Sequence, residues 1–353
     1  MFSGKINKTI KVRSRAPLRI GLAGGGTDLS NYYKKYGGLI LNATINKYAY
    51  CELILIDKGF LAESLDYSVN FQVEEFNLEN EYNIPKELIL HAAVYRKIIK
   101  LFNKGENINI KIITACDSPI GSGLGSSSTL VVAIIKAFDE LLNLGLDDYE
   151  ISELAYEIER IDCNLEGGKQ DQYAASFGGL NFIEFEKDRT IVNSLKIKNW
   201  FKCELESSLI LHFTGISRLS GDVIKEQSKN TTLKGNETLS YFHQIKKEAY
   251  FMKEAFLKCD KNKIKESLQR SWKLKSMTSK KVSNKKIEET IKLGLKYGAQ
   301  AAKISGAGGG GFVLFLSQPC HSIKLLNKLR ERSSETFFCS FTEQGAQSWC
   351  INN

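Results

Sequence analysis

The chain of 353 residues is too long for one ordinary hydrophobic core and predicts about two domains. Its 42% hydrophobic and 25% charged residues are typical of a globular protein. The net charge of +9 is spread out, without an arm of consecutive basic residues, so we do not predict a nucleic-acid-binding protein.

Cysteine and histidine usage argues against a zinc protein. The eight cysteines form no C-x-x-C pair, and the four histidines are scattered along the chain. The basic N-terminus lacks the apolar core of a signal peptide, and no apolar run approaches the length of a membrane span. We therefore expect a cytoplasmic protein with reduced thiols and no membrane partner.

The first part of the chain alternates predicted strands with glycine-rich stretches. A glycine-rich stretch at 20–28 follows the first strand, and another at 119–128 follows the strand that ends at 114. The hydrophobic patterns predict strands at 9–19, 39–43, 48–56 and 108–114, and helices at 29–36 and 87–102.

The stretch 119–128 has the composition of a phosphate-binding loop. It holds three glycines and four hydroxyls in ten residues, and an apolar helix follows at 130–138. Glycine allows a close backbone approach, and the N–H groups and dipole of a helix N-terminus favour an anion. A flexible linker is the alternative interpretation. A linker would have polar flanks, whereas this helix is apolar almost all round and therefore expected to be buried.

Common phosphate and hydrolase motifs do not match this loop. It lacks the lysine of G-x-x-x-x-G-K-[ST], and the chain has no V-A-I-K, H-R-D or D-F-G landmark of a protein kinase. The triple glycine at 24–26 does not match the dinucleotide fingerprint. A serine hydrolase is poorly supported, because G-x-S-x-G is absent and no histidine lies near the serine run.

Two carboxylates follow the loop. We predict a helix over 148–163 with Asp147 as its N-cap and Glu159 at the border of its buried face. Asp171 lies in a polar stretch that we expect to be a loop, and a strand follows at 180–185. Glu159 and a loop serine suit Mg²⁺, which prefers hard oxygen ligands.

Asp171 is suited to orient or deprotonate an acceptor hydroxyl, and Arg19 to neutralise charge on a transferring phosphoryl group. Each residue also has an ordinary interpretation. A helix-border Glu is usually solvated, an Asp near glycines is usually a turn residue, and an Arg in a strand is usually a surface cation. The order of these residues along the chain is what indicates phosphoryl transfer.

The second part of the chain is expected to form a separate domain after a boundary between 187 and 202. A third glycine-rich stretch occupies 305–311 and shares no fixed period with the other two, so the three are separate elements of one site. We predict strands at 200–214, 312–316 and 336–341, lysine-rich helical structure at 221–286, and helices at 287–297 and 322–332, with 301–304 leading into the third glycine-rich stretch.

The glycine-rich stretches resemble the three motifs of the GHMP kinases, which phosphorylate small molecules. P-I-G-S-G-L-G-S-S-S at 119–128 is similar to their P-x-x-x-G-L-G-S-S-A loop. A-P-L-R-I with G-G-G-T-D, at 16–20 and 24–28, resembles their first motif, and K-I-S-G-A-G-G-G-G at 303–311 their third. The resemblance implies an α+β fold of two domains, 1–195 like ribosomal protein S5 domain 2 and 196–353 ferredoxin-like, with the site between them.

Within the family, the first motif is most similar to that of kinases acting on D-glycero-D-manno-heptose 7-phosphate. The fucokinase domain has a similar motif. This implies transfer of the ATP γ-phosphate to the anomeric hydroxyl, giving heptose 1,7-bisphosphate for surface polysaccharide precursors such as GDP-heptose. The implied ATP-binding residues are Pro119, Gly121, Ser122, Gly123, Leu124, Gly125, Ser126, Ser127 and Ser128.

By the same resemblance, Ser127 and Glu159 would bind Mg²⁺, with Ser126 an alternative to Ser127. Asp171 would be the base and Arg19 its electrostatic partner. For the sugar 7-phosphate, Arg218 and Lys303 are the candidate cations, because an Arg fork and neighbouring hydroxyls suit phosphate. The implied substrate-binding residues are Gly25, Gly26, Thr27, Asp28, Asp171, Arg218, Lys303, Gly306, Gly308 and Gly309.

Three alternatives remain open at this point. The acceptor could be an unphosphorylated sugar such as L-fucose, the chain could bind ATP and sugar without turnover, or it could be an ATP-dependent decarboxylase on the same fold. The joint presence of Arg19, Glu159 and Asp171 argues against a non-catalytic relative. The expected partner is a small sugar phosphate, and the expected state is a monomer or homodimer.

Overall fold

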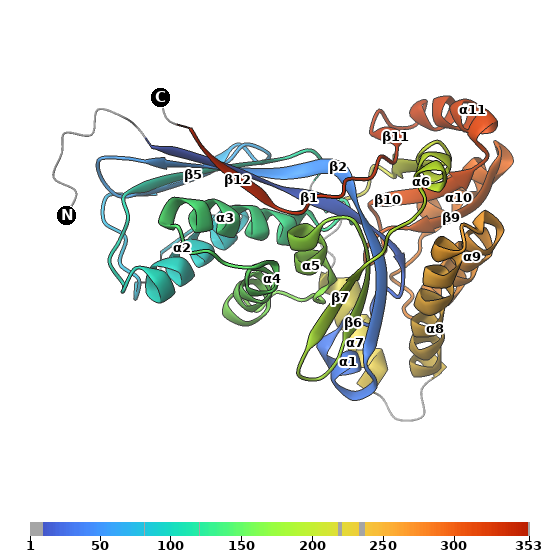
Figure 1. The fold of residues 1–353 in the computed structure, drawn as a ribbon, viewed down its shortest axis with the longest axis horizontal. Helices are drawn as coiled ribbons and strands as arrows, with labels where there is room; N and C mark the ends of the chain where they lie inside the picture. Colours follow the sequence, from blue (N-terminus) through green and yellow to red (C-terminus); the bar gives the residue numbers. More distant parts are fainter. Residues whose placement is uncertain (1–9, 81, 120, 218–220, 233–236, 352–353) are drawn as a thin grey trace.

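The computed structural model describes residues 10–80, 82–119, 121–217, 221–232 and 237–351. Within these ranges the chain forms two sheets with helices packed on them, so the predicted mixed α+β class is confirmed. Figure 1 shows the larger, N-terminal unit beside the smaller, C-terminal one. No helix in the described ranges has the length and apolarity needed to cross a bilayer.

The larger sheet contains eight strands in the described residues, in the order β12-β1-β2-β5-β3-β4, with β6 joining β2 to β7. All neighbours are antiparallel except β3 and β5. The strands are β1 (Lys11–Ala23), β2 (Gly38–Leu55), β3 (Phe60–Ser64), β4 (Val69–Val73), β5 (Ile110–Cys116), β6 (Leu180–Phe185), β7 (Thr190–Ser194) and β12 (Gln347–Ile351).

Helices cover one face of this sheet, and α3 (Ser126–Leu142) is the central one. The apolar run 130–138 is buried almost throughout, as its composition predicts. Helix α3 and the sheet share one hydrophobic core. This packing fixes the position of the residue at which the glycine loop ends and the helix begins. The other helices here are α1 (Ser30–Tyr36), α2 (Ile89–Phe102), α4 (Asp148–Glu157) and α5 (Gln170–Phe177), with a 3₁₀ turn at Lys86–Leu88 and a π-helical turn at Ile158–Asp162.

The smaller sheet has the order β11-β8-β10-β9 and is antiparallel throughout. Its strands are β8 (Leu209–Phe213), β9 (Ala299–Ile304), β10 (Phe312–Ser317) and β11 (Thr336–Phe338). The helices in this part of the chain are α6 (Asn199–Glu206), α7 (Gly221–Thr232), α8 (Glu237–Leu257), α9 (Lys261–Ser276), α10 (Lys285–Lys296) and α11 (Pro319–Arg330). Figure 1 shows α8 and α9 side by side.

Strand alternation in β10 divides the smaller sheet between two cores. Leu314 and Leu316 join a core that contains Leu18 and Ile20 of β1, so this face ties the two units together. Val313 and Phe315 point the other way, into a core built with α10 and α11. The continuous core between the units holds residues from β1 and β9 in a fixed relation.

The last strand corrects the predicted domain limits. The boundary at 195/196 falls between β7 and α6, but β12 pairs with β1 in the large sheet, from Lys11 opposite Ile351 to Arg15 opposite Gln347. The predicted C-terminal domain therefore includes a strand, Gln347–Ile351, that belongs to the larger sheet. Strand β12 was not predicted, because its half-exposed sequence lacks a clear alternation.

Two other predictions about strands were wrong. The strands expected at 39–43 and 48–56 are one strand, β2, whose register shifts against β1 between Pro17 and Arg19. The strand expected at 200–214 begins only at Leu209, because α6 precedes it. Phe201 and Leu205 are both buried and stand four residues apart, which is a helical spacing.

The predicted N-cap of α4 is confirmed. The Asp147 carboxylate accepts from the Glu150 N–H at 2.8 Å, and the Glu150 carboxylate accepts from the Asp147 N–H at 2.9 Å. We expect Asp147→Ala to lower the free energy of unfolding by about 1 kcal/mol in urea titrations. Glu150→Gln is the control, because glutamine also completes a capping box. Equal losses in both variants would contradict the capping role.

Candidate active site

The loop between β5 and α3 ends in an uncapped helix N-terminus. Gly125 is the N-cap residue, with φ of 83° and no side chain to accept from the first-turn N–H groups. No acidic residue lies in the first turn. Such a terminus presents donors and a positive dipole end to an anion, as predicted for 119–128. Residue 120 lies outside the described part of this loop.

The third glycine stretch packs directly on this loop. The Phe312 N–H donates to the Ser122 carbonyl at 2.9 Å, and the Ser305 hydroxyl donates to the Gly123 carbonyl at 3.2 Å. A Cβ on Gly123 would lie 2.7 Å from the Ser305 carbonyl oxygen, so glycine is needed for this close approach. These two motifs, which are distant in the sequence, therefore form one structure.

Three glycines of the third stretch, which are predicted to bind the substrate, pack closely on neighbouring backbone. A Cβ on Gly306 would lie 2.6 Å from the Gly123 carbonyl oxygen, and one on Gly308 would lie 2.8 Å from that of Val282. The Gly309 N–H donates to Val282 as well, at 2.7 Å. Backbone packing therefore explains why glycine is needed at these positions, and substrate binding by these residues stays a prediction.

Asp171 and Arg19 form an ion pair beside the phosphate loop. Arg19 Nε and Nη2 lie 2.7 and 2.6 Å from Asp171 Oδ1, and Nη1 donates to the Gly123 carbonyl at 2.7 Å. Asp171 is not in a loop as predicted but in the first turn of α5, near Gly125: a Cβ there would lie 3.4 Å from Asp171 Oδ2. Within the described residues no hydrogen bond engages Oδ2.

Asp28 is held against the start of α5. Its carboxylate accepts from Gly26 N–H at 3.1 Å, from Gln170 N–H at 3.2 Å and from the Gln170 side chain at 3.3 Å. Burial, and then the nearby Asp171 carboxylate, raise the pKa of Asp28, while these backbone hydrogen bonds oppose the shift. A carboxylate set beside a second one is suited to accept from neighbouring sugar hydroxyls.

The neighbours of Asp28 in its loop have structural roles. Thr27 is buried, and its hydroxyl donates to the carbonyls of Gly24 and Leu39 at 2.8 and 2.9 Å, so this side chain shapes the loop rather than facing a ligand. A Cβ on Gly26 would lie 2.8 Å from the Phe242 ring. Gly26 is therefore required where α8 packs on the loop.

Ser127 and Glu159 are brought together as predicted. The Ser127 hydroxyl lies 3.1 Å from Glu159 Oε1, and Gln172 Nε2 donates to Oε2. Glu159 is fully buried rather than at a helix border, because α4 widens into the π-helical turn and carries the side chain inward. A carboxylate and a hydroxyl fit Mg²⁺, and the buried Gln172 Oε1 has no partner in the described structure.

Arg160 follows Glu159 in the same turn and was not predicted. Its guanidinium lies 3.6 Å from Glu159 Oε1 and donates to the Ser128 hydroxyl at 3.3 Å. A Cβ on Gly167 would overlap this group, at 2.3 Å from Arg160 Cζ. The π-helical turn therefore directs two charged residues into the site, which a regular helical projection does not reveal.

Of the two cations predicted for the sugar 7-phosphate, the structure describes Lys303. Lys303 is buried, and its ammonium donates to the carbonyls of Gly21 and Leu22 at 2.8 Å each, joining β9 to β1. Burial, with Lys275 and Arg19 nearby, lowers the pKa of Lys303 well below its usual value. Lys303 is thus a link between the units rather than a phosphate ligand. Arg218 lies outside the described residues.

Lys275 is a site residue that the sequence reading missed. It ends the buried stripe of α9, and its ammonium donates to the Gly306 carbonyl and would lie 3.1 Å from a Cβ on Gly25. Helical spacing was the available signal, because Leu268, Ser271 and Lys275 are three and four residues apart. Many lysines lie between 225 and 296, and Lys275 is on the buried face of α9.

Gly168 leaves the space that Asp28 fills, since a Cβ would lie 1.8 Å from Asp28 Oδ2. We expect Gly168→Ala to raise KM for the acceptor about 10- to 100-fold, the value of a hydrogen bond to a charged group, and to leave KM for ATP unchanged. Steady-state kinetics measure both. Gly145→Ala is the control for general strain away from the site, because alanine is disfavoured at its φ of 69° although a Cβ there meets nothing within 4 Å. A parallel rise in both KM values would contradict the assignment.

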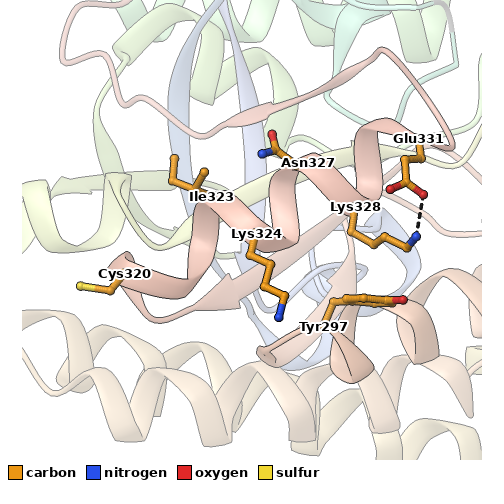
Figure 2. A pocket seen from close by; sticks show the side chains of 7 residues that line it. All are labelled: Tyr297, Cys320, Ile323, Lys324, Asn327, Lys328 and Glu331. Atoms are coloured by element: carbon orange, nitrogen blue, oxygen red, sulfur yellow. Dashed lines mark hydrogen bonds and ion pairs between the residues drawn. The ribbon is translucent and has the colours of Figure 1, made fainter.

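Another hollow lies on the outer surface of α11. Figure 2 shows Lys324 and Lys328 extending toward the Tyr297 ring, with Lys328 also paired to Glu331 at 2.6 Å. It is lined by surface side chains and shares no residue with the glycine stretches. This hollow is therefore separate from the candidate site at the junction between the two units.

Comparisons with known proteins agree with this geometry. Residues 88–179 match the family model described as GHMP kinases N terminal domain, and residues 252–334 match GHMP kinases C terminal. The chain is 44% identical over 344 residues to D-glycero-alpha-D-manno-heptose 7-phosphate kinase of Campylobacter jejuni, covering 96% of this chain and 99% of that protein.

Solved structures show the same fold. A crystal structure described as a D-glycero-D-manno-heptose 1-phosphate kinase from Bacteroides thetaiotaomicron superposes with a TM-score of 0.80 at 39% identity, covering 97% of this chain and all of that one. The mevalonate kinase of Methanococcus jannaschii, at 21% identity, has a TM-score of 0.72 over 94% and 98% of the two chains and shows the fold alone.

A two-domain phosphotransferase, with a glycine loop and an Asp–Arg pair at the domain junction, is the class of protein that this fold and site define. The chain belongs to the GHMP kinases.

Proposed function

We propose that this kinase transfers the γ-phosphoryl group of ATP to the anomeric hydroxyl of D-glycero-D-manno-heptose 7-phosphate. The product is heptose 1,7-bisphosphate, a precursor for GDP-heptose and surface polysaccharide. The 44% identity over nearly the full length of the Campylobacter jejuni enzyme supports the heptose acceptor. Donor and acceptor then meet between the loop 119–128 and Asp28.

The observation that carries the proposal is the geometry of Asp171. Arg19 binds one carboxylate oxygen, Oδ1, and thereby orients the group, while Oδ2 has no hydrogen-bond partner among the described residues. The side chain is 21% exposed, so a ligand can reach it. A general base needs such an open oxygen within reach of the acceptor hydroxyl.

In the proposed step, the acceptor oxygen attacks the γ-phosphorus, a new O–P bond forms, and the bond from that phosphorus to the β,γ-bridging oxygen breaks. The acceptor proton passes to Asp171 Oδ2, and ADP leaves with the bonding electron pair. Arg19 and the N-terminus of α3 stabilise charge near Gly123 and Gly125. Mg²⁺, held by Ser127 and Glu159, would neutralise phosphate charge.

The test is product identification by ³¹P NMR with ATP, Mg²⁺ and candidate acceptors. Heptose 7-phosphate should yield a new anomeric phosphate signal together with ADP. The name of the Bacteroides structure favours a second candidate, transfer to a heptose 1-phosphate, so that monophosphate is assayed in parallel. Turnover of L-fucose without turnover of either heptose phosphate would refute both.

A further inference from the structure

Lys275 brings a charge from the C-terminal unit into the site. It lies in the last turn of α9, where the helix dipole favours a cation, and it is 8% exposed. Its ammonium reaches the Gly306 carbonyl and passes within 3.1 Å of the Cβ position of Gly25. It therefore lies between the loop that carries Asp28 and the glycine stretch that packs on Gly123.

This ammonium has no ion-pair partner in the described residues. Neither nearby carboxylate forms an ion pair with it: Asp171 binds Arg19 through Oδ1, and Asp28 accepts from Gly26 and Gln170. One carbonyl accepts from an ammonium that has three N–H donors. A buried charge without an ion-pair partner is costly, so an anionic group of a ligand in contact with this ammonium would stabilise it.

The surrounding charges point to the same conclusion. Arg19 on β1 and Lys303 on β9 also face Lys275, but Arg19 is paired with Asp171 and Lys303 is bound to two carbonyls. Among these three cations, Lys275 has the fewest described contacts, because its ammonium donates only to the neutral Gly306 carbonyl. A phosphoryl group that binds here could therefore form an ion pair with the Lys275 ammonium.

We propose that the Lys275 ammonium binds a phosphoryl group of the substrates at the junction of the two units. The proposal rests on the proposed kinase function. Two sources supply this chemistry: the γ-phosphoryl group of the nucleotide and the phosphate already on the acceptor. Binding of either phosphate neutralises the positive charge of Lys275 between α9 and β1.

The experiment compares Lys275→Met, which keeps the volume and removes the charge, with the parent enzyme and with Lys273→Met, an exposed lysine on the same helix. For the acceptor phosphate, KM for heptose 7-phosphate should rise about 10- to 100-fold in Lys275→Met, with KM for unphosphorylated heptose unchanged. For the γ-phosphoryl group, calorimetry should show a similar loss of affinity for the ATP analogue AMP-PNP but not for ADP.

Lys275→Arg is the second variant, because arginine keeps the charge and allows the test even if Lys275→Met does not fold. Burial, and then Arg19, lower the pKa of Lys275 to about 8, while Asp28 and Asp171 oppose this shift. Above that pH the ammonium loses its proton, so kcat/KM of the parent should fall, and the fall should move to higher pH in Lys275→Arg.

Equal kinetics and equal AMP-PNP affinity in the parent and Lys275→Met, or an unchanged pH limb in Lys275→Arg, would overturn the proposal. Failure of the proposed function is seen separately, because the parent enzyme would then not turn over a heptose phosphate. The comparison of AMP-PNP with ADP needs no acceptor and still tests the nucleotide arm.

Discussion

Replacing Asp171 by asparagine is expected to reduce kcat by about 10²- to 10⁴-fold, the usual contribution of a general base. The amide keeps an oxygen near Arg19 but cannot take a proton at the position of Oδ2. Both KM values should change little, because binding does not require the proton transfer. A coupled assay for ADP measures kcat, and calorimetry with Mg·ATP and the acceptor measures binding.

Asp188→Asn is the matched control, since Asp188 is exposed and distant in the chain from the glycine stretches. Thermal unfolding of both variants separates catalysis from stability, because Asp171 also pairs with the buried Arg19. A loss of only a few-fold in kcat with normal binding would show that Asp171 orients the acceptor without acting as its base.

Replacing Glu159 by glutamine should raise the Mg²⁺ concentration needed for half-maximal activity by about 10- to 100-fold or more, judged from the effect of removing even outer-shell groups. The amide is isosteric but carries no charge to hold the ion. Manganese binding measured by electron paramagnetic resonance, with ADP present, provides a readout independent of turnover.

Glu157→Gln is the control for this substitution. Glu157 stands two residues earlier, and its half-exposed carboxylate pairs with Lys97 at 2.6 Å rather than with the phosphate loop. It should leave the metal requirement unchanged. Normal metal dependence in Glu159→Gln would instead assign Glu159 to positioning Ser127 and Gln172, which it contacts directly.

The local signals in the sequence predicted much of the framework. The apolar run at 130–138 is the buried helix that it indicates, and Asp147 is the N-cap of α4. Glycines at 121–125 and serines at 126–128 mark the uncapped N-terminus of α3. These features depend on spacing within a few residues, where propensity and periodicity act.

Contacts between distant segments were not predictable in the same way. Strand β12 pairs with β1 although more than three hundred residues separate them, and α6 was mistaken for a strand. Lys303 reads as a phosphate ligand by its place in a motif, yet two carbonyls of β1 occupy its ammonium. Lys275 is one of many lysines until packing shows which of them is buried.

By itself, the sequence determined the candidate residues for the chemistry, namely the glycine loop, Arg19, Glu159 and Asp171, because their types and order suit phosphoryl transfer. Only the tertiary structure decided which of their atoms remain open to a ligand. A charged side chain can bind a ligand only where neighbouring groups leave it unpaired. The core shared between the two units decides which groups lie next to each charge. Asp171 Oδ2 and the Lys275 ammonium are open by this criterion, and Lys303 is not.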